Sequence, residues 1–329
     1  MSFKKIKINT AYLILFAAVF LIAGYFLGFY LKKSETKIVK PNKHQSGFTY
    51  ISPLLECAIS EPDSVKTRDL ERKLRSFVDK KIKEDKITTA SIYFHDLNSH
   101  TWLGINRSEK FSPASLLKVP LMIAVLKYAE DNKDFLQQEI LAEDKYNVDV
   151  TPNIMPLKSV VAGEYYTVEE LIGYAIHYSD NLAANMLIVN TPNEYLDKVF
   201  LDIGILLPEE EVVENFMTVM DYASFFEILY NASYLNKEMS EYALSLLTHS
   251  SFPYGLSSGV PVGTAVAHKF GERVFENYKQ LHDCGIIYKE NNPYLLCVMT
   301  RANFTSSNNN FNEMAAFIKD ISLQIYNSL

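Results

Sequence analysis

The most regular pattern of hydrophobic and polar positions in the chain is that of amphipathic helices. Between residues 69 and 82, large apolar side chains recur every three or four positions and charged ones fill the gaps, which is typical of a helix with one buried face. The helix predicted over residues 166–178 has the clearest start, because Thr167 and Glu170 form a T-x-x-E capping box. Further helices are predicted over residues 115–130, 193–202, 218–231, 237–248 and 311–328.

Short apolar runs with the composition of strands lie on both sides of the central helices. Two of them flank a turn and would form a hairpin, and three more are separated by turn-prone residues; the ranges are 89–96, 101–105, 264–270, 281–288 and 294–301. Strands from both parts of the chain, with helices between them, favour one antiparallel sheet. The predicted fold class is therefore α+β, and the pattern alone leaves the strand order open.

The first 60 residues differ from the rest of the chain. Residues 11–31 are 21 positions without a charge, enough to cross the hydrocarbon core of a membrane as a helix. We interpret them as an uncleaved transmembrane anchor, because they are longer than a signal-peptide core and no clear small-x-small site follows. Residues 1–10 and a polar, lysine-rich tether over residues 32–60 would flank the anchor, and residues 61–329 would form one domain.

The composition narrows the class of protein. The chain has 329 residues, 48% of them hydrophobic, and a net charge of −7, so it can bury a core, and its acidic balance argues against a nucleic-acid partner. No cysteine and histidine spacing matches a metal site, and no cofactor is expected. We interpret Cys57, Cys284 and Cys297 as small buried apolar side chains. A disulfide between Cys284 and Cys297 is the alternative, because their strands are expected to be neighbours.

The first candidate for chemistry is the S-x-x-K pattern of Ser115 and Lys118. On a helix these positions share a face, so a lysine with a lowered pKa could deprotonate the hydroxyl. Ser112 is predicted to cap this helix, which would place Ser115 in a first turn whose backbone N–H groups can stabilise an oxyanion. The alternative is a helix that begins at Pro120 and leaves Lys118 in solvent.

Two further segments have ordinary structural interpretations when each is taken alone. Ser179, Asp180 and Asn181 lie between two predicted helices, where such residues commonly serve as N-caps. Lys269 and Gly271 lie near the end of a predicted strand. There the lysine would be a solvated edge charge, and the glycine would let another backbone approach closely.

Taken together and in this order, S-x-x-K, S-D-N and Lys269-Phe270-Gly271 resemble the signature set of the class A β-lactamase-like serine hydrolases, which includes penicillin-binding proteins. The similar region runs from about residue 66 to residue 329. The resemblance implies a five-stranded antiparallel sheet flanked by helices, with an all-helical subdomain inserted after the Ser115 helix. The active site would lie at their junction.

The resemblance also implies the catalytic roles. Ser115 would be the nucleophile that becomes acylated, and Lys118 would accept its proton. Ser179 would carry a proton to the leaving nitrogen, and its neighbour Asp180 would be the buried organiser of that turn. His268 next to the motif lysine is interpreted as structural.

The remaining implied roles concern binding. Asn181 would bind a substrate amide, and Lys269 would add positive potential that keeps Lys118 neutral and attracts an anionic substrate. Gly271 belongs to the same binding strand. The backbone N–H groups of Ser115 and Glu272 would form the oxyanion hole.

Two departures from the family pattern affect the function. Phe270 stands where the family has a hydroxyl that helps to hold the substrate carboxylate. No clear glutamate for water activation follows the S-D-N motif. The candidates in that neighbourhood are Glu209, Glu210, Glu211 and Glu214, and the alternative for them is a solvated acidic loop.

The expected function is that of a membrane-anchored serine hydrolase that acts on β-lactam amides. One alternative is a penicillin-binding peptidase whose partners are D-amino-acid peptides of the cell wall. Another is a non-catalytic binding module of the same fold. Because this chemistry takes place outside the cytoplasm, we expect residues 1–10 inside the cell and the domain on the extracytoplasmic side of the membrane, held by a single span.

Overall fold

The computed structural model of the protein describes residues 48–53, 65–147, 151–207, 214–304 and 311–329. Several sequence-based predictions lie outside these ranges, namely the anchor, most of the tether, Cys57 and Glu209, Glu210 and Glu211. None of the helices within the described ranges has both the length and the apolar character that a membrane crossing requires.

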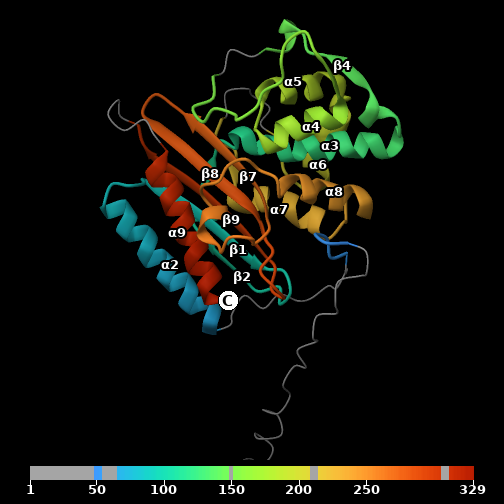
Figure 1. Ribbon diagram of the computed structural model, residues 1–329. Helices are drawn as coiled ribbons and strands as arrows, with labels where there is room; N and C mark the ends of the chain where they lie inside the picture. Colours follow the sequence, from blue (N-terminus) through green and yellow to red (C-terminus); the bar gives the residue numbers. More distant parts are fainter. Residues whose placement is uncertain (1–47, 54–64, 148–150, 208–213, 305–310) are drawn as a thin grey trace, which may run out of the picture. The chain divides into compact units, whose positions relative to one another are not determined.

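A five-stranded antiparallel sheet forms the centre of the domain (Figure 1). Its strand order is β2-β1-β9-β8-β7, with strands from both parts of the chain, as the pattern predicts. This confirms the α+β class and supplies the order that the sequence left open. The strands are β1 (Thr89–Asp96), β2 (Trp102–Ile105), β7 (Val266–Val274), β8 (Tyr278–Ile287) and β9 (Tyr294–Asn303).

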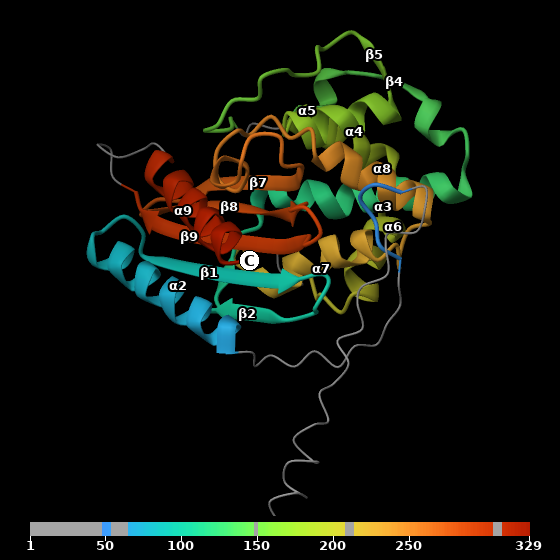
Figure 2. The same ribbon diagram turned by 60° about the horizontal axis from the view of Figure 1, so that its bottom comes forward.

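Two helices, α2 (Val65–Lys83) and α9 (Asn312–Ser328), cover one face of the sheet (Figure 2). Their apolar stripes are buried against each other and against the strands, as the helical spacing predicts. Phe77 of α2 stacks on Phe317 of α9 with ring centroids 5.6 Å apart. This layer makes the sheet a rigid support for what lies on its other face.

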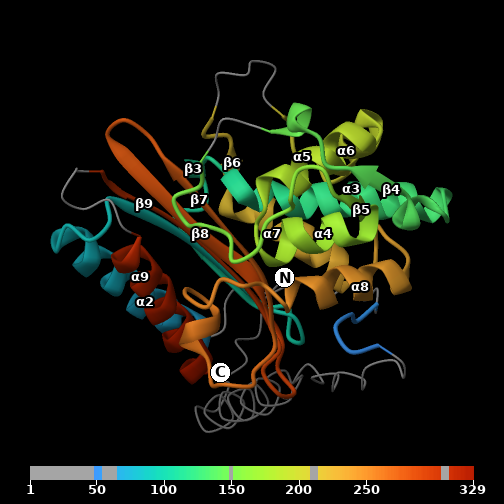
Figure 3. The same ribbon diagram turned by 45° about the horizontal axis from the view of Figure 1, so that its top comes forward.

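The remaining helices gather on the opposite side of the sheet (Figure 3). They are α3 (Lys118–Asp131), α4 (Val168–His177), α5 (Asn181–Asn190), α6 (Asn193–Asp202), α7 (Val219–Tyr230) and α8 (Lys237–Leu247). The α7 helix packs directly on β9 and β1 and joins this helical region to the sheet. The capping box at the start of α4 is confirmed, because Thr167 Oγ1 accepts from the Glu170 N–H at 3.1 Å and Glu170 Oε2 accepts from the Thr167 N–H at 2.8 Å.

The prediction that this inserted region is all-helical is wrong. Strand β4 (Glu139–Leu141) pairs with β5 (Tyr165–Thr167) inside this region. At its edge, β3 (Lys110–Phe111), which precedes the Ser115 turn, pairs with β6 (Met217–Thr218). Each ribbon forms where the chain returns beside itself, because pairing satisfies backbone groups that the short connections would otherwise leave without partners.

The interpretation of the two strand cysteines as separate apolar thiols is also wrong. Cys284 on β8 and Cys297 on β9 form a disulfide, which was the alternative. The physical reason is the strand register, which places the two residues directly opposite each other. A register of this kind cannot be read from periodicity, since a shift by one residue turns every side chain to the other face.

Candidate active site

Ser115 lies in a single turn of 3-10 helix, η1 (Ala114–Leu117), immediately before α3. The residue at the N-cap position of the turn is Pro113 rather than Ser112, and no side chain caps the turn. Ser112 instead uses its backbone, because its N–H donates to Gln280 Oε1 and its carbonyl contacts His282 Nε2. The predicted cap is therefore wrong, although the prediction of Ser115 in a first turn is close to the observed position.

Pro120 does not interrupt the helix that follows. It occupies the first turn of α3, where a backbone N–H is not needed for the helical hydrogen-bond pattern. The Leu116 carbonyl, which Pro120 deprives of a partner, accepts a hydrogen bond from the Tyr222 hydroxyl at 3.1 Å. The helix can therefore begin at Lys118, whose side chain is 6% exposed. The alternative of a solvated Lys118 is wrong.

The Lys118 amine is the centre of the polar cluster. Its Nζ lies 3.1 Å from Ser115 Oγ and 3.3 Å from Ser179 Oγ, and it donates to the Ser179 carbonyl at 2.6 Å. Asn181 Oδ1 lies 2.7 Å away. Burial lowers the pKa of Lys118 to about 7, against a smaller opposing effect of Asp180 and Glu272. The amine can therefore be neutral near pH 7, in reach of the serine hydroxyl.

The turn that carries Ser179 starts helix α5 and holds the Ser179 hydroxyl next to the Lys118 amine. Asp180 caps α5, since its Oδ1 accepts from the Ala183 N–H at 2.6 Å, and it is buried. Ser179 has a φ of 60°, a conformation that costs energy for a residue with a Cβ and that surrounding contacts must hold. The interpretation of this segment as an N-cap is confirmed, and so is the prediction that Asp180 is buried and organises the turn. The same carboxylate does both.

Lys269 is a buried site residue and not a solvated edge charge. It lies in the middle of β7, with no exposed surface, and its Nζ donates to Ser179 Oγ at 2.9 Å and to the Phe270 carbonyl at 3.0 Å. Burial, and then the charge of Lys118, lower the pKa of Lys269 well below its ordinary value. The Ser179 hydroxyl thus lies between two amines, both of which burial drives toward the neutral form.

Gly271 permits the close approach of β7 to the serine turn. A Cβ at this position would lie 2.7 Å from the Pro113 carbonyl oxygen and 3.0 Å from the Leu116 nitrogen, so no larger residue fits without moving the backbone. This agrees with the predicted role of the glycine. The next residue, Glu272, lines the same cavity as Ser115.

The Glu272 carboxylate holds a loop across from β7. Its Oε1 accepts from the Asn153 N–H at 2.6 Å, and its Oε2 accepts from Asn153 Nδ2 at 2.9 Å. Asn153 was not predicted, because it lies in a stretch without periodicity and gives no signal in the sequence. Asn185 was not predicted either; it lies one turn after Asn181 on α5 and lines the cavity with it, so helical spacing could have found this residue.

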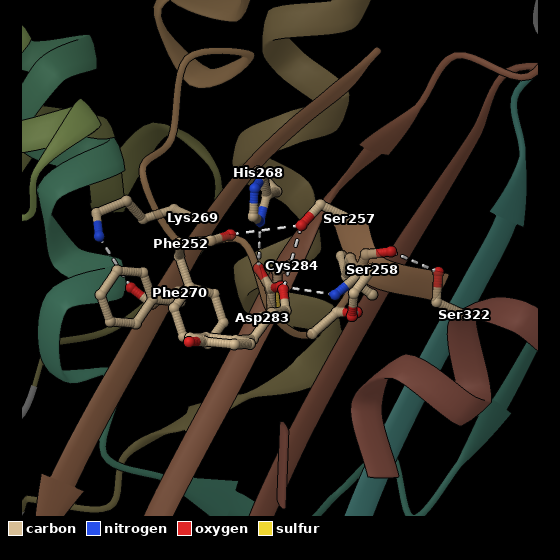
Figure 4. Close-up of polar contacts among 12 residues, drawn as sticks. Phe252, Ser257, Ser258, His268, Lys269, Phe270, Asp283, Cys284 and Ser322 are labelled. Carbon is tan, nitrogen blue, oxygen red and sulfur yellow. Dashed lines mark hydrogen bonds and ion pairs between the residues drawn. The ribbon is translucent and has the colours of Figure 1, made fainter. Parts of the chain in front are cut away.

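Phe270 does not line the cavity, and its ring lies against Phe252 (Figure 4). Its ring stacks on Phe252 with centroids 4.2 Å apart, in the core between the sheet and α9. Beside it, His268 Nδ1 lies 2.8 Å from Asp283 Oδ1, and Asp283 Oδ2 accepts from the Leu256 N–H at 2.9 Å. His268 is therefore structural, as predicted, and position 270 offers no hydroxyl to a substrate.

A cavity of about 780 Å³ opens next to Ser115. Of the predicted site residues, Ser115, Lys118, Asn181 and Glu272 line it, whereas Ser179, Lys269 and Gly271 do not. Among the lining residues that the structure describes, Glu272 is the one carboxylate. Glu214 is instead paired with Arg273 at 2.8 Å. The lining residues are Ala114, Ser115, Leu117, Lys118, Leu121, Thr151, Pro152, Asn153, Asn181, Ala184, Asn185, Ile188, Leu196, Phe200, Leu207, Phe216, Glu272, Arg273 and Val274.

Residues 69–329 match the model of the β-lactamase enzyme family. The chain belongs to this family. Members are serine hydrolases of the class A β-lactamase type, and the geometry around Ser115 agrees with that chemistry. No curated protein matches the chain.

Solved structures of β-lactamase-like proteins share the fold of this family member. PBP-A is 21% identical, with a TM-score of 0.64 over 79% of this chain and 95% of its own. A β-lactamase from Chitinophaga pinensis is 19% identical, with a TM-score of 0.66 over 78% and 99%. A variant of PBP-A, also 21% identical and with a TM-score of 0.64 over 79% and 96%, was solved as an acyl-enzyme complex with penicillin G.

Proposed function

We propose that the protein is a serine hydrolase that is acylated at Ser115 by β-lactams and hydrolyses the resulting ester. One observation carries the proposal: a buried lysine amine with a pKa of about 7 lies 3.1 Å from the Ser115 hydroxyl. A neutral amine in that position can act as a general base, and such a base is most effective when its pKa lies near the pH at which it works. Removing the Lys118 amine, the Lys269 amine and the Ser179 hydroxyl from water costs free energy, and a non-catalytic module would gain nothing in return. This arrangement therefore argues against such a module.

The acylation step follows from the contacts of three residues. Lys118 Nζ takes the proton of Ser115 Oγ as the oxygen bonds to the carbonyl carbon of the amide. The negative charge on the carbonyl oxygen is stabilised by the backbone N–H groups of Ser115 and Glu272, and loss of one such donor typically costs about 2.7–4 kcal/mol. The carbon–nitrogen bond then breaks, and the leaving nitrogen takes the proton of Ser179 Oγ, which regains one from Lys118.

The two amines around Ser179 support its role as the relay. Its Oγ lies 3.3 Å from Lys118 Nζ and 2.9 Å from Lys269 Nζ. Because burial disfavours charge on both lysines, the pair can release and accept protons at low cost. Asn181, which shares a hydrogen bond with Lys118, is the side chain in position to orient the amide of the substrate.

A second candidate function is that of a penicillin-binding peptidase, which is acylated in the same way by β-lactams and whose own substrates are D-amino-acid peptides. The observation that favours it concerns water activation. Glu214 is paired with Arg273, which lines the cavity, and the Glu272 oxygens accept hydrogen bonds from Asn153. Neither described carboxylate is therefore free to activate water for release of the acyl group.

The test uses two reagents on the purified protein. A chromogenic cephalosporin reports turnover, and a fluorescent penicillin followed by intact-mass measurement reports the adduct on Ser115. Sustained turnover supports the hydrolase, and one adduct per chain that persists for hours supports the peptidase. If neither reagent reacts, or if Ser115→Ala reacts like the wild type, both functions are wrong.

We further propose that the domain acts outside the cytoplasm, anchored by residues 11–31. The disulfide between Cys284 and Cys297 supports this, because such bonds persist in oxidising compartments. In a bacterial host, the full chain should sediment with membranes, and fluorescent penicillin added to spheroplasts should label it. Labelling that requires lysis of the spheroplasts would contradict the proposal.

A further inference from the structure

One part of the cavity next to Ser115 has walls of apolar side chains. Three helical segments each contribute a pair four residues apart, so that both members lie on the same helix face. We call this part the apolar chamber and define it by these pairs: Leu117 and Leu121 from η1 and α3, Ala184 and Ile188 from α5, and Leu196 and Phe200 from α6.

The chamber runs from solvent into the interior of the helical region. Leu117 and Ile188 are exposed, whereas Leu121, Ala184 and Phe200 are buried. Phe216 also lines the cavity. An apolar cavity that is open at one end and lined at depth by alkyl and aryl groups gains most from an apolar ligand, because water there lacks polar partners.

The polar groups of the site correspond to the leaving-group side of the scissile bond, and the apolar chamber corresponds to its acyl side. The leaving group must face Ser179, which supplies its proton, and neither Ser179 nor Lys269 lines the cavity. The chamber residues Leu117 and Leu121 line the same cavity as Ser115 and Lys118. A carbonyl carbon at Ser115, with its leaving group toward Ser179, therefore has its acyl substituent toward the chamber.

We propose that the apolar chamber binds the acyl group of the substrate, so that the protein prefers acyl donors with an unbranched aliphatic or aryl acyl chain over donors with a short one. This rests on the proposed acylation of Ser115 and names the substrate class of that reaction. Each methylene that leaves water for the chamber adds up to about fourfold to the acylation rate.

The test varies the acyl chain and keeps the leaving group constant. p-Nitrophenyl acetate, butyrate and hexanoate are compared by the second-order rate of p-nitrophenol release in the first turnover, and intact mass confirms the ester on Ser115. The rate constant should rise at least tenfold from acetate to hexanoate. Changing the leaving group at constant acyl chain should leave this chain-length ratio unaltered.

Two variants on one helix locate the effect. Ala184→Phe fills the chamber and should lower the hexanoate-to-acetate ratio to about one. Val189→Phe adds a ring on the same helix at a position that is 65% exposed and does not line the cavity, and it should keep the wild-type ratio. Thermal unfolding of both variants shows whether they fold. A wild-type ratio near one, or equal ratios in the two folded variants, would overturn the proposal.

A binding measurement separates this inference from the proposed function. The neutral fluorophore N-phenyl-1-naphthylamine, added to Ser115→Ala, tests the chamber without any acylation. Binding that Ala184→Phe abolishes and Val189→Phe retains supports the chamber even if no ester or β-lactam acylates Ser115. Absence of binding, or binding that Ala184→Phe leaves intact, overturns the chamber even if acylation occurs.

Discussion

The two stages of the proposed reaction have very different surroundings. Around Ser115, the groups needed for acylation lie within hydrogen-bond distance of one another, and Lys118, Ser179 and Lys269 are buried. They are held from three elements, namely η1–α3, the turn before α5, and β7. The described carboxylates that could serve release are engaged elsewhere: Glu272 binds Asn153, and Glu214 binds Arg273. Among the described residues, the groups for acyl-bond formation are thus assembled, whereas these two carboxylates already have partners.

The largest effect should come from removing the base. Lys118→Met keeps a buried unbranched side chain but has no proton acceptor, so acylation by a fluorescent penicillin should slow by about 10²–10⁴-fold. The variant should fold, because the amine it removes is one whose burial disfavours charge. Stopped-flow or gel labelling measures the rate. Labelling within tenfold of the wild type would mean that another group deprotonates Ser115.

The next effect concerns the contact between β7 and the serine turn. Gly271→Ala puts a Cβ against the Pro113 carbonyl, so one backbone must move, at a cost of about 1–3 kcal/mol. We expect a lower melting temperature and acylation slowed by about tenfold to a hundredfold. Ala302→Gly, on β9, is a control for a small change in the sheet, and it should lower stability while leaving the acylation rate near that of the wild type.

The pH dependence of acylation should follow the pKa of Lys118. Only the neutral amine accepts the serine proton, so the rate should fall about tenfold per pH unit below about pH 7 and level off above it. Stability has the same sign: between about pH 7 and the ordinary lysine pKa the unfolded chain binds one more proton, so folding stability rises with pH. The pH dependence of the rate should disappear in Lys118→Met, whereas the rise of stability with pH should only weaken, because burial also lowers the pKa of Lys269. A pH-independent wild-type rate would contradict the assignment.

Much of this arrangement could be predicted from the sequence. The parts that could not be predicted share one feature, which is that they depend on contacts between distant segments of the chain. Periodicity gives the helices, and the capping box at Thr167 fixes the start of α4 because its partners are three residues apart. The orientation of Phe270 also follows from a local rule, since it lies next to Lys269 in a strand whose side chains alternate. Contacts between distant segments give no such signal. Tyr222 compensates for Pro120 from another helix, and the Cys284–Cys297 pairing depends on register.

The smallest expected effect sharpens the comparison between acylation and release. Glu214→Gln removes a carboxylate whose ion pair with Arg273 is about 42% exposed on both sides, a pair of the kind that contributes about 0–1 kcal/mol. Because Glu214 does not line the cavity, the lifetime of the penicillin adduct should change by less than about threefold. Glu109→Gln is a matched control, since Glu109 forms a similar surface pair with Arg301 at 2.9 Å. If Glu214→Gln lengthens the adduct lifetime tenfold and Glu109→Gln does not, Glu214 activates water after all, and release is as much a built function of this chain as acylation.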